Sequence, residues 1–269
     1  MSGRIDDCRY KRYNNDVRMH IYFYEVNDVQ NGFLRRRIGL LMCMIGLVMI
    51  FAAVSYSELD KIHTVSADTS AQYTLIIDPG HGGDDGGAVS ADGVQEADIN
   101  LAIGNRLCAV SALCGIKTVM TRSTEEIAYP DGADTIAARK VADQKQRVAR
   151  INATPNAVLI SIHQNQYPTP QPHGAQVLYA PTADSAAFGE LMHDMLVTNL
   201  DPANRRVAAP ISDDIYLMKN IACPGVLVEC GFLSNPDELA RLQTDAYQIQ
   251  LSMAMLSSYL QYFQNGCHI

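Results

Sequence analysis

The sequence predicts an α/β fold, with a mixed β-sheet flanked by helices forming a single domain behind an N-terminal apolar segment. Short apolar runs alternate with helix-like patterns over residues 73–269, as in domains built around a largely parallel or mixed sheet. Hydrophobic residues make up 48% of the 269-residue chain and charged residues 19%, which supplies a core and excludes intrinsic disorder for most of it. About 200 residues in the C-terminal part suit one domain.

The first strand is expected at Tyr73–Asp78 (YTLIID), which runs into a glycine-rich loop. Apolar residues at helical spacing then predict a helix from Glu96 to about Cys114, with Gly115 as its stop. Further strands are expected at Ile116–Thr121, Val158–Ile162, Ala175–Ala180, Ile215–Met218 and Gly225–Cys230, and further helices at Ile136–Ile151, Ser185–Leu200 and Pro236–Gln264. In such sheets the chemistry collects beyond the carboxyl ends of the strands.

The N-terminal part predicts a membrane anchor. Residues 38–54 contain no charge and directly follow Arg35-Arg36-Arg37, which favours a cytoplasmic segment at 1–37, a transmembrane segment at 38–54 and an extracytoplasmic chain beyond it. Residues 55–72 read as a linker to a domain at 73–269. A cleaved signal peptide stays open as an alternative, although 37 residues are long for its charged region. A buried core helix is disfavoured because the run is apolar on every face.

Charge and cysteine content argue against a nucleic-acid-binding protein and against a zinc site made of cysteine thiolates. The net charge is −8, and from residue 58 onward 24 acidic residues stand against 13 basic ones, so nucleic acid is not an expected partner. Seven cysteines occur without a CxxC pair, which argues against a thiolate zinc site. One disulfide is possible, with no pairing indicated.

Four polar residues stand where elements begin or end. His81 follows the first strand, Glu96 opens the first helix, His163 closes the apolar run at 159–162, and Glu229 closes the run GVLVE. Two imidazoles and a carboxylate are a common catalytic zinc set, and a further carboxylate can take a proton from the metal-bound water. Taken singly, each histidine also fits a hydrogen-bonded structural role, and Glu96 fits a favourable place at a helix N-terminus.

The loop GHGGDDGG at residues 80–87 could be mistaken for a phosphate cradle. It lacks the lysine of a P-loop, and Asp84 and Asp85 would repel a phosphate. The glycines therefore favour a sharp turn that points His81 into a site.

Four segments resemble the zinc-dependent N-acetylmuramoyl-L-alanine amidases of bacterial cell walls: IIDPGHGGDDGGA (76–88), GVQEADINLAI (93–103), LISIHQNQ (159–166) and GVLVECGFLSNPDE (225–238). The resemblance covers about residues 73–265 and implies that His81, Glu96 and His163 bind Zn²⁺ and that Glu229 is the catalytic carboxylate. It also implies that peptidoglycan is the substrate and that the sheet is mixed. Gly86 departs from the proline of many relatives, at a turn.

Within the family, the stretches SIHQNQYP, HGAQVLYAP and 204–220 resemble the sporulation-specific amidases. That resemblance implies hydrolysis of spore cortex peptidoglycan on the way to muramic δ-lactam, with a partner deacetylase, a possible accessory protein, and a location between the two membranes of the forespore. A vegetative cell-wall amidase, a zinc peptidase acting on the stem peptide, and an inactive membrane-anchored wall-binding adaptor remain alternatives.

Two further sets of residues are candidates for supporting roles. Asp98 and Asn165 lie near the predicted ligands in sequence, and either could orient an imidazole; Asp98 fits a helix surface equally well. Arg139, Arg147 and Arg150 could pair with carboxylates of the peptide stem, with a solvated helix face as the simpler interpretation.

Overall fold

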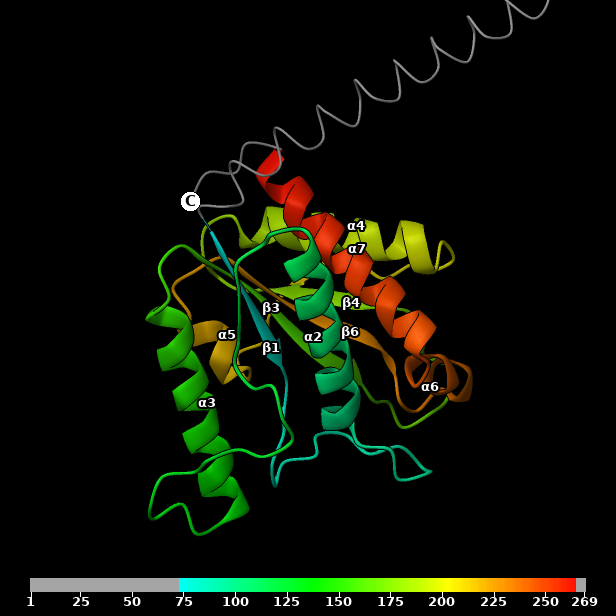
Figure 1. Ribbon diagram of the computed structural model, residues 1–269. Coiled ribbons are helices and arrows are strands. Elements are labelled where there is room, and N and C mark those ends of the chain that lie inside the picture. Colours follow the sequence, from blue (N-terminus) through cyan, green and yellow to red (C-terminus); the bar gives the residue numbers. More distant parts are fainter. Residues whose placement is uncertain (1–72, 265–269) are drawn as a thin grey trace, which may run out of the picture. The chain divides into compact units, whose positions relative to one another are not determined.

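The computed structural model describes residues 73–264, in which six strands form one mixed sheet with helices on both faces (Figure 1). The strand order is β2-β1-β3-β6-β4-β5; β2, β1, β3 and β6 are parallel, β4 runs antiparallel to β6, and β5 is parallel to β4. The strands are β1 (Thr74–Pro79), β2 (Thr118–Met120), β3 (Ala157–Asn165), β4 (Gln176–Tyr179), β5 (Ala209–Pro210) and β6 (Gly225–Phe232). The predicted mixed sheet flanked by helices is confirmed.

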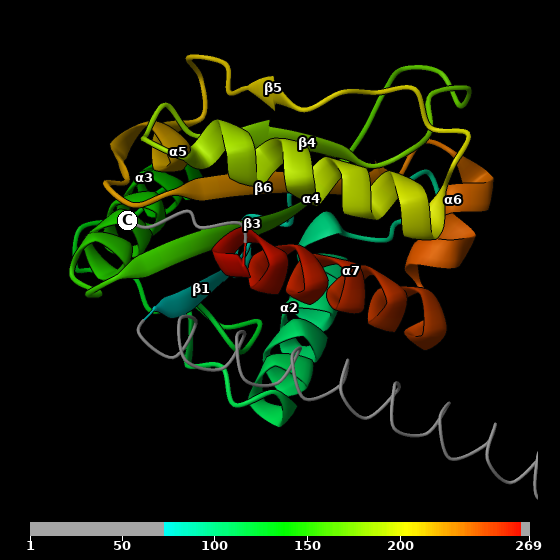
Figure 2. The ribbon, with the colours of Figure 1, turned by 90° about the horizontal axis from the view of Figure 1, so that it is seen from above.

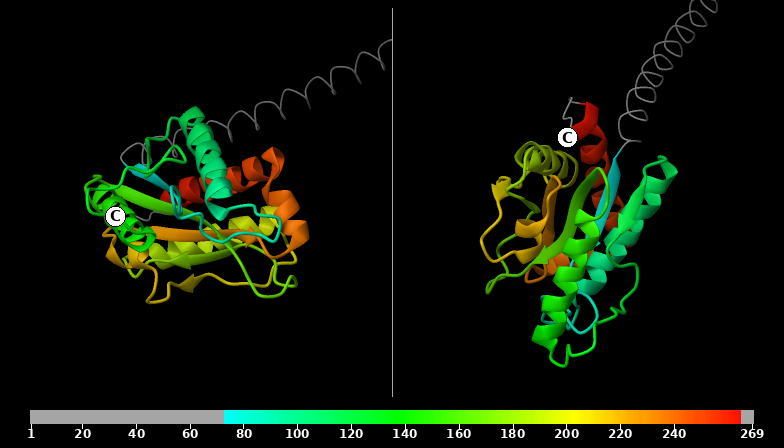
Figure 3. Two further views of the ribbon diagram at one scale, coloured as in Figure 1. Left: turned by 90° about the horizontal axis from the view of Figure 1, so that it is seen from below. Right: turned by 90° about the vertical axis from the view of Figure 1, so that its left-hand side faces the viewer.

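The helices form two layers. They are α2 (Glu96–Leu113), α3 (Ile136–Asn152), α4 (Ser185–Leu200), α5 (Tyr216–Asn220), α6 (Pro236–Leu242) and α7 (Asp245–Gln264). Helices α2, α4 and α7 supply buried residues to the larger apolar cluster, whereas α3 and α5 supply the smaller cluster on the opposite face. Figure 2 shows α4 and α7 side by side over the sheet, and Figure 3 shows the sheet from two further directions.

The alternation of side chains along the strands produces these two clusters. In β3, Val158, Ile160 and Ile162 belong to the larger cluster, and Leu159 belongs to the smaller one. Successive side chains of a strand point to opposite faces, so a strand covered on both faces is apolar at every position. The apolar runs noted in the sequence are therefore central strands.

The segment Ile215–Met218, expected as a strand, is instead helix α5 at Tyr216–Asn220. Leu217, Met218 and Ile221 are buried while Tyr216 is exposed. Burial at neighbouring positions and again three residues later suits one face of a helix and not the alternation of a strand. The C-terminal helical region is two helices, α6 and α7, and the two-residue strand β5 has no clear sequence signal.

The predictions for residues 1–72, including the anchor at 38–54 and the linker, lie outside the described residues. Across residues 73–264, no helix combines the length and apolar character that crossing a bilayer demands. Cys108, Cys114, Cys223 and Cys230 are free thiols.

Candidate functional site

The sheet sets two of the four predicted site residues side by side. In the parallel pair β3–β6, His163 is the register partner of Glu229. Register partners on adjacent strands project to the same face, so both side chains rise from the face that carries α3 and α5. Both strands extend past the ends expected from the sequence, and the extension of β3 brings His163 into the strand beside Glu229.

His81 lies in the loop after β1, and its backbone is left-handed, with φ = +60°. The loop closes on itself through Gly82 N–H, which donates to Asp85 O over 2.8 Å. The imidazole of His81 has a partner at each nitrogen. Nδ1 lies 2.9 Å from Asp85 Oδ2, and Nε2 lies 3.3 Å from Glu96 Oε2. Asp85 therefore fixes the tautomer that leaves Nε2 facing Glu96.

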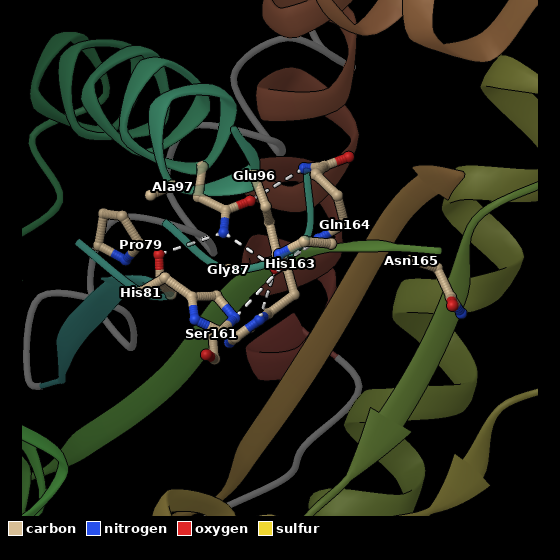
Figure 4. A network of polar contacts seen from close by, with 12 residues as sticks. Pro79, His81, Gly87, Glu96, Ala97, Ser161, His163, Gln164 and Asn165 are labelled. Carbon is tan, nitrogen blue, oxygen red and sulfur yellow. Dashed lines mark hydrogen bonds and ion pairs between the residues drawn. The ribbon is translucent and has the colours of Figure 1, made fainter. Parts of the chain in front are cut away.

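Glu96 is the first residue of α2 and is 3% exposed. Its Oε1 lies 2.9 Å from His163 Nδ1 and accepts from the backbone N–H of Gln164 over 3.0 Å; its Oε2 accepts from Ala88 N–H over 2.9 Å. Burial by itself would raise the pKa of Glu96, but the hydrogen bonds with His163 and His81 outweigh it and hold that pKa well below its usual range. The carboxylate is ionised and faces both imidazoles (Figure 4).

The three predicted ligands meet at one point. His81, Glu96 and His163 each offer one donor atom, and these atoms all lie within 4.8 Å of one another. The two imidazole rings stand edge to face, with centroids 5.0 Å apart. Burial disfavours the charged form of His81, yet the hydrogen bonds with Asp85 and Glu96 raise its pKa to about 9. Two nitrogens and one carboxylate oxygen converging in this way fit a zinc ion that keeps a fourth position open.

Glu229 has an oxygen with no protein partner. Its Oε2 is buried and accepts no hydrogen bond from residues 73–264. Burial raises the pKa of Glu229, while the charges of His163 and His81 oppose that rise. A buried carboxylate oxygen left open beside the cluster of His81, Glu96 and His163 is available to a water molecule or a substrate.

Two glycines keep the cluster tight. A Cβ on Gly80 would lie 2.3 Å from Cε1 and Nε2 of His163, and a Cβ on Gly87, whose φ is +71°, would lie 2.6 Å from Glu96 Oε2. The loop backbone therefore touches the site directly. This close approach, as well as the turn expected from the sequence, accounts for the glycines at these positions.

The supporting residues differ from those proposed from the sequence. Asp98 is exposed on α2, and Asn165 points away from the cluster in Figure 4. Asp85 and Asn100 take the supporting role instead. Asn100 Nδ2 donates to Glu96 Oε1 over 3.3 Å, and its spacing of four residues from Glu96 on one helix was the available sequence signal.

The three arginines of α3 differ in burial and in their partners. Arg147 is 5% exposed and hydrogen-bonded to Asp78 and Asp143, so the solvated-face interpretation is wrong for it. Arg139 pairs with Asp84, and Arg150 is exposed, as a solvated helix face predicts.

The fold and the cluster together define a protein of the α/β class with a candidate metal site, and comparison with known proteins identifies its family. The model of the N-acetylmuramoyl-L-alanine amidases matches residues 75–258, so the chain belongs to this family and is an amidase. This result confirms the resemblance recognised in the sequence.

Three relatives illustrate the range of similarity. The germination-specific N-acetylmuramoyl-L-alanine amidase of Bacillus subtilis is 33% identical over 233 residues, which is 86% of this chain and 97% of the relative. The CwlD amidase of Clostridioides difficile, solved in complex with the GerS lipoprotein, is 33% identical, with a TM-score of 0.69 over 72% of this chain and 99% of that one. The amidase AmiC2 of Nostoc punctiforme is 28% identical, with a TM-score of 0.60 over 72% of this chain and 99% of that one.

Proposed function

We propose that the protein hydrolyses the amide between N-acetylmuramic acid and L-alanine with one zinc ion held by His81, Glu96 and His163. The observation that carries this proposal is the convergence of their donor atoms within 4.8 Å, in a chain of the amidase family. A zinc ion bound there would polarise the lactyl carbonyl and lower the pKa of a bound water to about 7.

Glu229 is proposed as the proton carrier. Its buried Oε2 is not engaged by any group of residues 73–264, and its strand places it beside His163. It would accept a proton from the attacking water and deliver it to the leaving nitrogen of alanine. Asp85 keeps the Nδ1 proton of His81 in place, so that the same nitrogen of this imidazole always faces the metal.

The substrate is proposed to be spore cortex peptidoglycan. Supporting this are the stretches that resemble sporulation amidases, the germination-specific name of the B. subtilis relative, and the similarity to CwlD. The peptide-free muramic acid product would then pass to a deacetylase on the way to muramic δ-lactam. Because the C. difficile relative was solved with a lipoprotein, an accessory protein is also proposed for this chain.

Mass spectrometry of the products tests the substrate. The purified protein is incubated with zinc and with cortex or vegetative peptidoglycan, and released glycan and peptide are identified. Free stem peptides that begin with L-alanine are expected, at a higher rate from cortex. Shortened stems still attached to glycan would show a peptidase instead, and equal rates on both walls would favour the vegetative role.

The location is proposed from residues 1–72. Three arginines before the apolar run 38–54 predict the amidase domain on the outer side of a membrane, and in a sporulating cell between the mother-cell and forespore membranes. A protease that cannot enter intact protoplasts should remove residues beyond 58. Protection of those residues until lysis would contradict the predicted topology.

A further inference from the structure

Two buried arginines bind the backbone of the segment that presents His81. Arg122 Nε donates to Pro79 O over 2.9 Å, and its Nη2 donates to Gly80 O over 3.0 Å. Arg147 Nη1 donates to Pro79 O over 2.8 Å, and its Nη2 donates to His81 O over 2.6 Å. Three consecutive carbonyls, Pro79 to His81, thus each accept a charge-assisted hydrogen bond.

Both guanidinium groups are anchored to regular structure. Arg147, on α3, also binds Asp78 Oδ1 and Asp143 Oδ2, each over 2.9 Å. Arg122, just after β2, also donates to Ala97 O over 2.8 Å, in the first turn of α2. Because Ala97 follows Glu96, Arg122 connects the two chain segments that carry His81 and Glu96.

The segment needs external support because of its backbone. A non-glycine residue at φ = +60°, as His81 is, has a strained backbone that persists only where the surroundings impose it. Gly82 and Gly83 continue the irregular path with positive φ. The arginines supply donors to the carbonyls at the end of β1 and in this loop, and Asn100 Nδ2 also donates to Gly80 O over 3.2 Å.

Both arginines are buried and make their hydrogen bonds within the protein. Arg122 is 7% exposed and Arg147 is 5% exposed. A guanidinium offers five N–H groups. Each of the two arginines donates four hydrogen bonds to acceptors within the protein.

We propose that Arg122 and Arg147 are positioning residues that set the affinity of the site for its metal, by holding His81 and Glu96 at binding distance. The inference rests on the proposed zinc site. It assigns to the two arginines a role beyond folding, because the carbonyls they bind belong to the ligand-bearing loop itself.

Arg147→Lys in the full chain tests the proposal, with Arg150→Lys as the matched control on the same helix. Lysine keeps the charge but cannot span four acceptors. Zinc affinity, measured by chelator competition on folded protein, should fall about 10–100-fold in the first variant, as for outer-shell changes at metal sites. Arg150 is exposed, so its variant should match the wild type.

A second readout separates positioning from folding. The visible spectrum of the Co²⁺-loaded Arg147→Lys protein should change in position and intensity, because the ligand geometry changes. A purely structural role would lower the melting temperature of the metal-free protein while leaving chelator competition and the cobalt spectrum of the folded fraction unaltered. That result would overturn the proposal.

Asp143→Ala covers the case in which Arg147→Lys does not fold. It removes Asp143, which accepts from Arg147 Nε, and leaves Asp78 and the loop carbonyls in place as partners of Nη1 and Nη2. A fall in zinc affinity that is smaller than the one expected for Arg147→Lys supports the proposal. Zinc affinity equal to that of the wild type overturns it. A wild-type protein that binds no zinc would refute the metal site itself, whereas one that binds zinc without cleaving muramoyl-L-alanine would refute only the function.

Discussion

The two histidines of the site are held in different ways. His163 lies within β3, where the parallel ladder to β6 fixes it beside Glu229. His81 lies in a loop with a left-handed backbone, and side chains from α3 and from the segment after β2 hold that loop. The difference shows that a sheet positions a side chain through its own hydrogen bonds, whereas a loop depends on distant residues for the same rigidity.

The largest effect on turnover is expected at Glu229, which the sheet holds beside His163. Glu229→Gln keeps the shape of the side chain and removes the proton acceptor. Turnover should fall by roughly 10²–10⁴-fold with zinc still bound, because general acid–base groups contribute about that factor. Metal analysis and a product assay measure the two quantities. Glu190→Gln, at an exposed position, is the control; loss of zinc in Glu229→Gln would instead make Glu229 a ligand.

The second prediction concerns Gly80, where the loop that carries His81 contacts the imidazole of His163. In Gly80→Ala the new Cβ would come within 2.3 Å of the His163 ring, so the loop or the imidazole must move. Zinc affinity should fall by about 100-fold, the upper end for a change outside the ligands. Gly93→Ala is the control, because its Cβ meets nothing within 4 Å although its φ is +84°. It should lose some stability and no metal affinity; equal zinc binding by both variants would contradict the close approach.

The third prediction concerns a substitution that affects the support of His81 and leaves His163 and Glu229 unchanged. Asp85→Ala removes the partner of His81 Nδ1, so the imidazole can rotate and change tautomer. Zinc affinity should fall about 10–100-fold by chelator competition. Asp84→Ala changes the neighbouring carboxylate, which pairs with Arg139 outside the cluster, and should leave affinity unchanged. If both variants bound zinc as the wild type does, the hydrogen bond from Asp85 to His81 would have no part in setting the affinity.

The smallest effect is expected at a histidine outside the site. His193 on α4 is 6% exposed, and burial lowers its pKa below the ordinary value of 6.5. Below about pH 6.5 the unfolded chain binds a proton that the folded His193 does not, so its contribution to stability is present above that pH and lost as pH falls. One proton limits the slope to about 1.4 kcal/mol per pH unit.

Urea unfolding of the wild type and of His193→Gln between pH 7.5 and 5.5 measures this contribution. The wild type should lose more stability over that range than the variant. Identical losses would mean that His193 is protonated as readily in the folded state as in the unfolded chain.

Most of the helices and strands, and the residue types of the candidate site, can be predicted from local sequence patterns. Apolar runs ending in His163 and Glu229 predict buried strands with a polar residue at one end, and the order of motifs predicts the family. These features are local, because strand periodicity and glycine-rich turns depend on neighbouring residues. The helix at Tyr216–Asn220 was missed for the converse reason, since a short apolar stretch fits either a strand or a helix until its packing is known.

The side chains that support the loop at residues 80–87 could not be predicted from the sequence, because they come from distant parts of the chain. Arg147 is 66 residues from His81 in sequence and Arg122 is 42 residues from Gly80. The sequence favoured a solvated helix face for Arg147 and assigned no role to Arg122. Their burial follows from the parallel crossovers that bring α3 and the end of β2 beside β1. A charged side chain becomes a buried donor only when the fold supplies acceptors around it, and this long-range condition has no signature in local sequence.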